Sequence, residues 1–133
     1  LEADLFVVVA FKKIPKEIWS IPSKGTINLH ASLLPDYRGA APINWAIING
    51  ENKTGITTFF INDKIDYGDI ILKKEINIDK TTTAAQLHRE MINKGSKLLI
   101  ETIIKIEKNE TKTFKQDKFI TRLFEVILVF RVH

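Results

Sequence analysis

The sequence lacks cysteine altogether and has a single methionine among its 133 residues. The absence of cysteine excludes disulfides, thiolate metal ligands and a cysteine nucleophile. No apolar run approaches the ~20 residues that a membrane-spanning helix needs, and no secretory leader pattern is present at the start. A strong excess of one charge sign is also missing, because 20 Lys and Arg stand against 16 Asp and Glu, so a nucleic-acid partner is only weakly favoured. We therefore expect a cytoplasmic protein.

What the sequence does contain is an alternation of strand and helix patterns in a chain that is 44% hydrophobic. Residues 5–11 are continuously apolar and rich in valine, as in a strand buried on both faces of a parallel sheet. Further strands are predicted at residues 26–30, 56–61 and 70–75, with short helices that begin at Pro15 and Pro42. This order predicts one α/β domain, or part of one, with a mostly parallel sheet.

The most regular helix pattern follows Thr83, which forms a capping box with Gln86 three residues later. We expect this helix to end near Glu107. Its buried face should recur with a period of 3.6 residues, at Leu87, Met91, Leu98, Thr102 and Ile106. Gly95 inside the helix costs ~1 kcal/mol relative to alanine, which predicts that another element packs closely there.

Two polar side chains lie at the end of the strand predicted at residues 26–30. Asn28 and His30 are two positions apart and therefore point to the same side of the strand. A turn-rich loop at residues 32–39 follows directly, and ligands of such sheets bind beyond the carboxyl ends of the strands. A carboxamide donor beside an imidazole suits a reaction that handles a carbonyl oxygen and a proton together.

Three local features carry a family resemblance: Asn28-x-His30, the run Ser32-Leu33-Leu34-Pro35 with Tyr37-Arg38-Gly39, and Ile65-Asp66-Tyr67-Gly68-Asp69. Together they resemble the catalytic domain of the formyltetrahydrofolate-dependent formyltransferases, over about residues 3–108. The resemblance implies a Rossmann-like formyltransferase fold, mostly parallel and flanked by helices. Residues 1–108 would be a partial, N-terminally truncated catalytic domain, and residues 109–133 a linker or an atypical C-terminal tail.

The resemblance implies transfer of a formyl group from 10-formyltetrahydrofolate to an amine, without a metal. Asn28 would donate a hydrogen bond to the formyl oxygen as negative charge develops on it. His30 would hydrogen-bond the same intermediate or take the proton of the amine, since imidazole titrates near neutral pH. Asp66 would orient His30 and stabilise its charged form. Arg38 is expected to fix its loop by hydrogen bonds rather than to touch substrate.

Each of these residues also has an ordinary structural interpretation. Asn28 could satisfy a turn, His30 could be a buried structural histidine, and Asp66 could form an Asx-type turn before Gly68. Their joint occurrence at the spacing of the family favours the catalytic interpretation. The resemblance further implies a set of folate-binding residues, which are Ser32, Leu33, Leu34, Pro35, Phe11, Ile14, Ile61 and Ile65.

The acceptor is suggested by the members that the chain is most similar to. Residues 10–19 and 39–43 look most like the enzymes that act on methionyl-tRNA, which would make the parent activity initiator tRNA formylation in translation initiation. A sugar nucleotide or another small amine is the alternative acceptor, a folate hydrolase is a more distant alternative, and an inactive folate-binding remnant is an alternative of a different class. We expect a monomeric fragment with an open sheet edge at residues 5–11.

Overall fold

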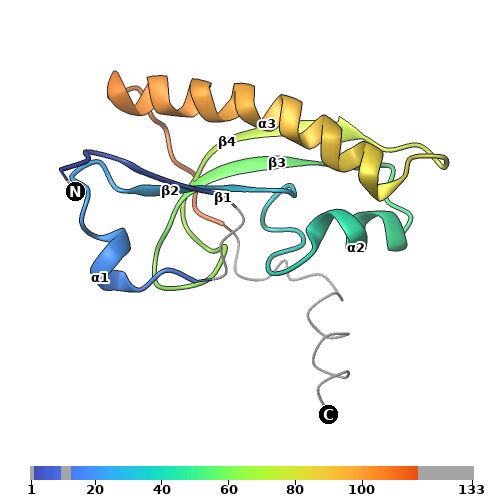
Figure 1. Cartoon of the computed structure of the whole chain (residues 1–133), viewed down its shortest axis with the longest axis horizontal. Helices are drawn as coiled ribbons and strands as arrows, with labels where there is room; N and C mark the ends of the chain where they lie inside the picture. Colours follow the sequence, from blue (N-terminus) through green and yellow to red (C-terminus); the bar gives the residue numbers. More distant parts are fainter. Residues whose placement is uncertain (1, 10–12, 117–133) are drawn as a thin grey trace, which may run out of the picture.

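The computed structural model describes residues 2–9 and 13–116, which form a four-stranded sheet with helices around it (Figure 1). The strands lie in the order β1-β2-β3-β4. The elements are β1 (Phe6–Val9), α1 (Lys16–Trp19), β2 (Thr26–His30), α2 (Pro42–Ile48), β3 (Lys53–Phe60), β4 (Ile70–Asn77) and α3 (Ala84–Glu107). Phe11 and the tail from residue 117 onward lie outside the described residues, so the predictions made for them stay predictions. No helix in the described part is long and apolar enough to cross a membrane.

The sheet is mixed, whereas the sequence predicts a mostly parallel one. β1 and β2 are parallel, but β2 pairs antiparallel with β3, and β3 pairs antiparallel with β4. A parallel return needs a crossover to the opposite end of the sheet. The connection through α2 makes no such crossover, because it stays at the carboxyl end of β2, where His30 pairs with Thr57 of β3. Strands β3 and β4 form the hairpin that the sequence suggests.

Helix α3 lies along one face of the sheet (Figure 1) and contributes Leu87, Met91 and Leu98 to the main core cluster. Its capping box is present, since the Thr83 hydroxyl accepts from the Gln86 N–H and the Gln86 side chain accepts from the Thr83 N–H. Every residue of the predicted buried face is buried. A Cβ atom on Gly95 would lie 3.0 Å from the Leu29 side chain of β2. The predicted close packing at this glycine is therefore confirmed.

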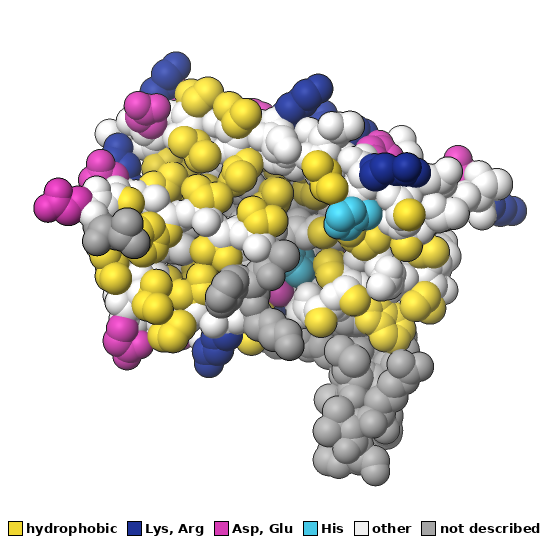
Figure 2. All heavy atoms as spheres, in the orientation of Figure 1, with side chains coloured by type: hydrophobic (Ala, Val, Ile, Leu, Met, Phe, Trp, Pro, Cys, Tyr) yellow, Lys and Arg dark blue, Asp and Glu magenta, His cyan; other side chains and the backbone are white. Residues whose placement is uncertain are grey.

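The sequence also predicts that residues 5–11 are buried on both faces of the sheet. This prediction is wrong for the part that the structure describes as strand β1. Val7 and Val9 are 41% and 55% exposed. Among the described strands β1 lies at the sheet edge and pairs with β2 alone, so the expected open edge is present. Further exposed apolar side chains lie on α3, at Ile92, Ile100 and Ile104. Figure 2 shows apolar side chains gathered over this part of the molecule.

The two short helices are less buried than their apolar residues suggest. Ile18 of α1 and Ile48 of α2 are exposed, and Trp45 is only half-buried. Ala46 is the buried residue of α2, and it joins the same core cluster as Leu87 of α3. Helix α2 therefore closes the end of the core beside the carboxyl end of β2, where Asn28 and His30 lie.

Candidate active site

The end of strand β2 holds Asn28 and His30 as the alternation of side chains predicts. Both are nearly buried, at 7% and 8% exposure. Leu29 between them packs against the core beneath α3. The Asn28 Oδ1 atom is buried and has no hydrogen-bond partner within the described part of the chain. A buried polar atom without a partner costs about 1–3 kcal/mol, so this carboxamide is suited to a ligand that would complete its hydrogen bonds.

The imidazole of His30 is held in one orientation by the backbone of the following loop. Its Nε2 atom lies 2.8 Å from the carbonyl oxygen of Tyr37. Because a carbonyl can only accept, Nε2 carries the proton and donates it. The Tyr37 side chain is fixed in turn, since its hydroxyl donates to Glu51 at 2.6 Å and accepts from Asn49 at 3.0 Å. Because Nε2 already carries a proton and donates it to Tyr37, Nδ1 is the ring atom that can accept one.

Asp66 faces that Nδ1 atom from the loop between β3 and β4. Its Oδ2 lies 3.7 Å from His30 Nδ1, and both side chains are 9% exposed. This separation exceeds a hydrogen bond but lies within the outer range of an ion pair when the imidazole is protonated. The same Oδ2 accepts a hydrogen bond from the Gly39 N–H at 2.8 Å. The Asx-type turn does not account for Asp66, because its carboxylate binds a residue 27 positions away.

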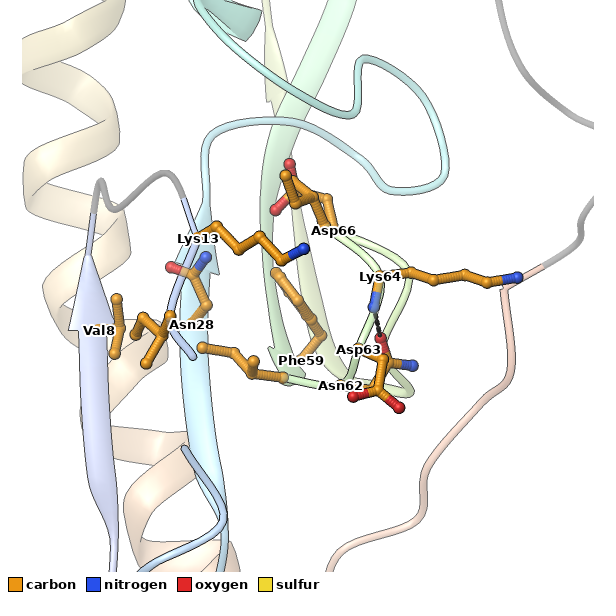
Figure 3. Close-up of a pocket in the computed structure, with 11 residues that line it drawn as sticks. Val8, Lys13, Asn28, Phe59, Asn62, Asp63, Lys64 and Asp66 are labelled. Atoms are coloured by element: carbon orange, nitrogen blue, oxygen red, sulfur yellow. Dashed lines mark hydrogen bonds between the residues drawn. The ribbon is translucent and has the colours of Figure 1, made fainter. Parts of the chain in front are cut away.

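The three predicted catalytic residues line one groove. Asn28, His30 and Asp66 border a hollow of about 740 Å³, whose wall is otherwise mostly apolar and includes Met91 and Leu99 of α3. A smaller adjoining hollow is lined by Asn28 and Asp66 together with Lys13 and Phe59. Figure 3 shows these four side chains around one space, with Lys64 directed away from it. The structure thus brings a carboxamide, an imidazole and a carboxylate to a single concave site.

Seven of the eight predicted folate-binding residues lie in the described part of the chain, and they divide into two groups. Ile14, Ile61 and Ile65 line the smaller hollow. The four residues Ser32, Leu33, Leu34 and Pro35 line neither hollow. Ser32 and Leu34 are completely buried: the Ser32 hydroxyl donates to the Asp36 carbonyl, and Leu34 packs against Phe59 and Ile70. In this conformation these two side chains stabilise the loop, and the assignment of all four to folate stays a prediction.

Two of the groups that shape the site are backbone atoms, which the pattern of side chains in the sequence does not indicate. The Tyr37 carbonyl sets the proton position on His30, and the Gly39 N–H holds the Asp66 carboxylate. Both residues have positive φ values, 54° and 89°. The glycine was the available signal, because glycine favours that backbone region. Arg38 between them fixes the loop as expected, since it is 3% exposed and donates to the Asp66 carbonyl.

A metal site has no structural support in the described part, where no three His, Asp or Glu side chains come together as a ligand group. His88 is exposed on α3 at the rim of the groove. Figure 2 shows exposed histidine on that face of the molecule. Asn28, His30 and Asp66 line the groove together with His88, which is exposed.

Comparison with known proteins identifies the family. Residues 1–103 match the family model described as formyl transferase. The chain belongs to the formyl transferase family. It is 57% identical over 117 residues to a methionyl-tRNA formyltransferase of Flavobacterium johnsoniae, covering 88% of this chain and 37% of that protein. It is also 57% identical over 108 residues to a methionyl-tRNA formyltransferase of Clostridioides difficile, covering 80% of this chain and 35% of that protein.

Solved structures of other formyl transferases confirm the predicted fold class. A sugar 3N-formyl transferase, determined in the presence of dTDP and 5-N-formyl-THF, superimposes with a TM-score of 0.76 at 28% identity. The match covers 89% of this chain and 44% of that one. The formyl transferase fold is therefore shared. This chain spans little more than a third of the length of the methionyl-tRNA formyltransferases that it matches.

Proposed function

We propose that this chain carries the reaction site of an enzyme that transfers a formyl group from 10-formyltetrahydrofolate to the amino group of methionyl-tRNA. The observation that carries the proposal is the convergence of Asn28, His30 and Asp66 on one groove, with 3.7 Å between His30 Nδ1 and Asp66 Oδ2. The relatives named methionyl-tRNA formyltransferase support the choice of acceptor.

The formyl donor is supported by the folates with which two solved relatives were determined. One was determined with 5-N-formyl-THF. The other is an N-formyltransferase of Helicobacter canadensis in complex with folinic acid and dTDP-3-aminofucose, 31% identical to this chain. The smaller hollow beside Asn28 is lined by Ile14, Ile61 and Ile65 together with polar residues, and its volume of about 30 Å³ admits only an edge of a folate ring. A folate placed there would present its formyl group to Asn28.

The reaction follows from these positions. The amine nitrogen attacks the formyl carbon, a new carbon–nitrogen bond forms, and negative charge develops on the formyl oxygen. The Asn28 amide N–H donates to that oxygen. Nδ1 of His30 takes the proton of the amine, and the Asp66 carboxylate stabilises the resulting imidazolium. The bond from carbon to N10 of the folate then breaks, and N10 receives the proton.

A sugar nucleotide is the second candidate acceptor, because one of these solved relatives is a sugar 3N-formyl transferase and the other was determined with dTDP-3-aminofucose. Their identity to this chain, 28% and 31%, is well below the 57% of the methionyl-tRNA enzymes. The balance of the comparisons therefore favours methionyl-tRNA. The inactive-remnant alternative has a direct test, since the 133-residue chain can be titrated with formyl-folate and absence of binding would favour it. The monomeric state remains a prediction.

A full-length relative that carries the segment of this chain in place of its own tests the proposal in a complete polypeptide. The 117 matched residues of the Flavobacterium johnsoniae protein are replaced by those of this chain, and the product is called the segment-replaced enzyme. It should formylate methionyl-tRNA with 10-formyltetrahydrofolate and leave uncharged tRNA unmodified. Formylation of a dTDP-amino sugar in place of methionyl-tRNA would overturn the acceptor, and inactivity on both, with folding intact, would overturn the function.

A further inference from the structure

Arg38, which is buried, and Gln116, which is half-buried, contact each other at the backbone of Asp66. The Arg38 guanidinium carbon lies 3.4 Å from the centre of the Tyr67 ring. Its Nε donates to the Asp66 carbonyl at 3.3 Å, and its Nη2 donates to Gln116 Oε1 at 2.9 Å. Neither Arg38 nor Gln116 lines either hollow. Any effect of these two residues on the site therefore acts through the backbone of the Asp66 loop, to which both donate hydrogen bonds.

Gln116 binds the Asp66 loop through its other amide atom. Nε2 donates to the carbonyl of Asp66 at 2.9 Å and to the carbonyl of Gly68 at 2.8 Å. These carbonyls flank Tyr67, the residue on which Arg38 stacks. Gln116 comes from the segment after α3, which is fastened to the start of β4 by a two-way backbone bridge between Phe114 and Ile70. A residue about fifty positions away thus fixes the loop.

The loop conformation depends on such contacts, because Asp66 has a left-handed backbone with φ of 58°. An aspartate tolerates this region but does not favour it strongly. Arg38 and Gly39, which are consecutive, bind the two ends of Asp66: the Arg38 side chain holds its carbonyl, and the Gly39 N–H holds its carboxylate. Gln116 contacts both Arg38 and the Asp66 carbonyl, and so connects the two loops.

We propose that Gln116 is a positioning residue for Asp66. Its amide fixes the backbone on either side of Tyr67, and so keeps the Asp66 carboxylate against the Gly39 N–H and opposite Nδ1 of His30. The catalytic consequence rests on the proposed function. The positioning itself does not, because the hydrogen bond between Gly39 and Asp66 can be observed without any substrate.

Gln116→Glu tests the positioning in the 133-residue chain. The substitution keeps an oxygen for Arg38 but removes the N–H donors to the carbonyls of Asp66 and Gly68. The measurement is hydrogen exchange of individual amides by NMR. Exchange of the Gly39 amide should become about 10-fold faster, as expected for weakening of one hydrogen bond to a charged group. Amides of the central strand β3 should keep their rates.

Lys115→Gln is the matched control, since Lys115 is an exposed neighbour and the substitution changes the net charge by the same amount. It should leave exchange at Gly39 unaltered. Gln116→Met is the second variant, because it removes the amide without adding a charge and gives a result if the glutamate prevents folding. An unchanged Gly39 rate in the folded variant, or equal acceleration of Gly39 and the β3 amides, would overturn the positioning role.

The segment-replaced enzyme then separates this inference from the proposed function. Gln116→Glu should lower kcat by about 10-fold and leave the KM for formyl-folate unchanged, because the folate hollow does not include Gln116. An unchanged kcat would overturn a catalytic consequence of the positioning. If the enzyme transfers no formyl group at all, the function fails, and the exchange rates at Gly39 still decide whether Gln116 positions Asp66.

Discussion

Asp66→Asn isolates the charge of the carboxylate from its place in the fold. The asparagine oxygen can still accept from the Gly39 N–H, which lies 2.8 Å from Asp66 Oδ2, so the loop should keep its conformation. What is lost is the negative charge 3.7 Å from His30 Nδ1. At that distance two unit charges attract each other by about 4 kcal/mol for an effective dielectric constant of ~20. Because the neutral amide retains a dipole, we take about 3 kcal/mol as lost, which predicts a fall in kcat of ~10².

The assay is formylation of methionyl-tRNA by the segment-replaced enzyme, followed at saturating formyl-folate. Asp69→Asn is the matched control, because it makes the same chemical change in the same loop and Asp69 lines neither hollow. It should leave kcat within ~3-fold of the parent, a difference below about 1 kcal/mol. If Asp66→Asn also falls within that range while the protein remains folded, the charge of Asp66 takes no part in the reaction.

Three further predictions concern the other site residues, the core and a surface loop. Asn28→Ala and His30→Ala should each lower turnover at least ~10²-fold with little change in thermal unfolding; near-normal turnover in either would remove that residue from the mechanism. Gly95→Leu should cost about 1–3 kcal/mol in urea unfolding, because a Cβ there already meets a β2 side chain at 3.0 Å, and no loss would show that α3 can shift. Hydrogen bonds from Thr81 lower the pKa of Asp79 from 3.8, so this carboxylate stabilises the fold above that pH and less as the pH falls. Asp79→Asn should therefore destabilise at about pH 7 but not at about pH 2, and equal effects at both would contradict the shift.

The sequence predicted the parts of the structure that depend on local pattern. The capping box at Thr83 and the buried face of α3 follow from residues a few positions apart, and both are present. The shared direction of Asn28 and His30 follows from the alternation of a single strand. The family resemblance supplied Asp66, which no local rule would place beside a histidine 36 positions earlier.

The parts that the sequence left out depend on backbone atoms and on the path of the chain. The Tyr37 carbonyl and the Gly39 N–H are backbone groups. Every residue has a backbone carbonyl and every residue except proline has a backbone N–H, so no side-chain pattern identifies these two. The antiparallel return into β3 depends on where the α2 connection ends in space. Gln116 reaches the Asp66 loop from a segment that pairs with Ile70 through Phe114, which is a contact between distant parts of the sequence.

The claim that Asn28, His30 and Asp66 act on one formyl group has a direct test in solution. The chain, labelled with ¹⁵N, is titrated with 5-formyltetrahydrofolate that carries ¹³C in the formyl group, and isotope-filtered NOEs from the formyl proton are recorded. We expect an NOE to the side-chain amide protons of Asn28. Binding of the folate with its formyl proton close to other residues, and with no NOE to Asn28, would contradict it.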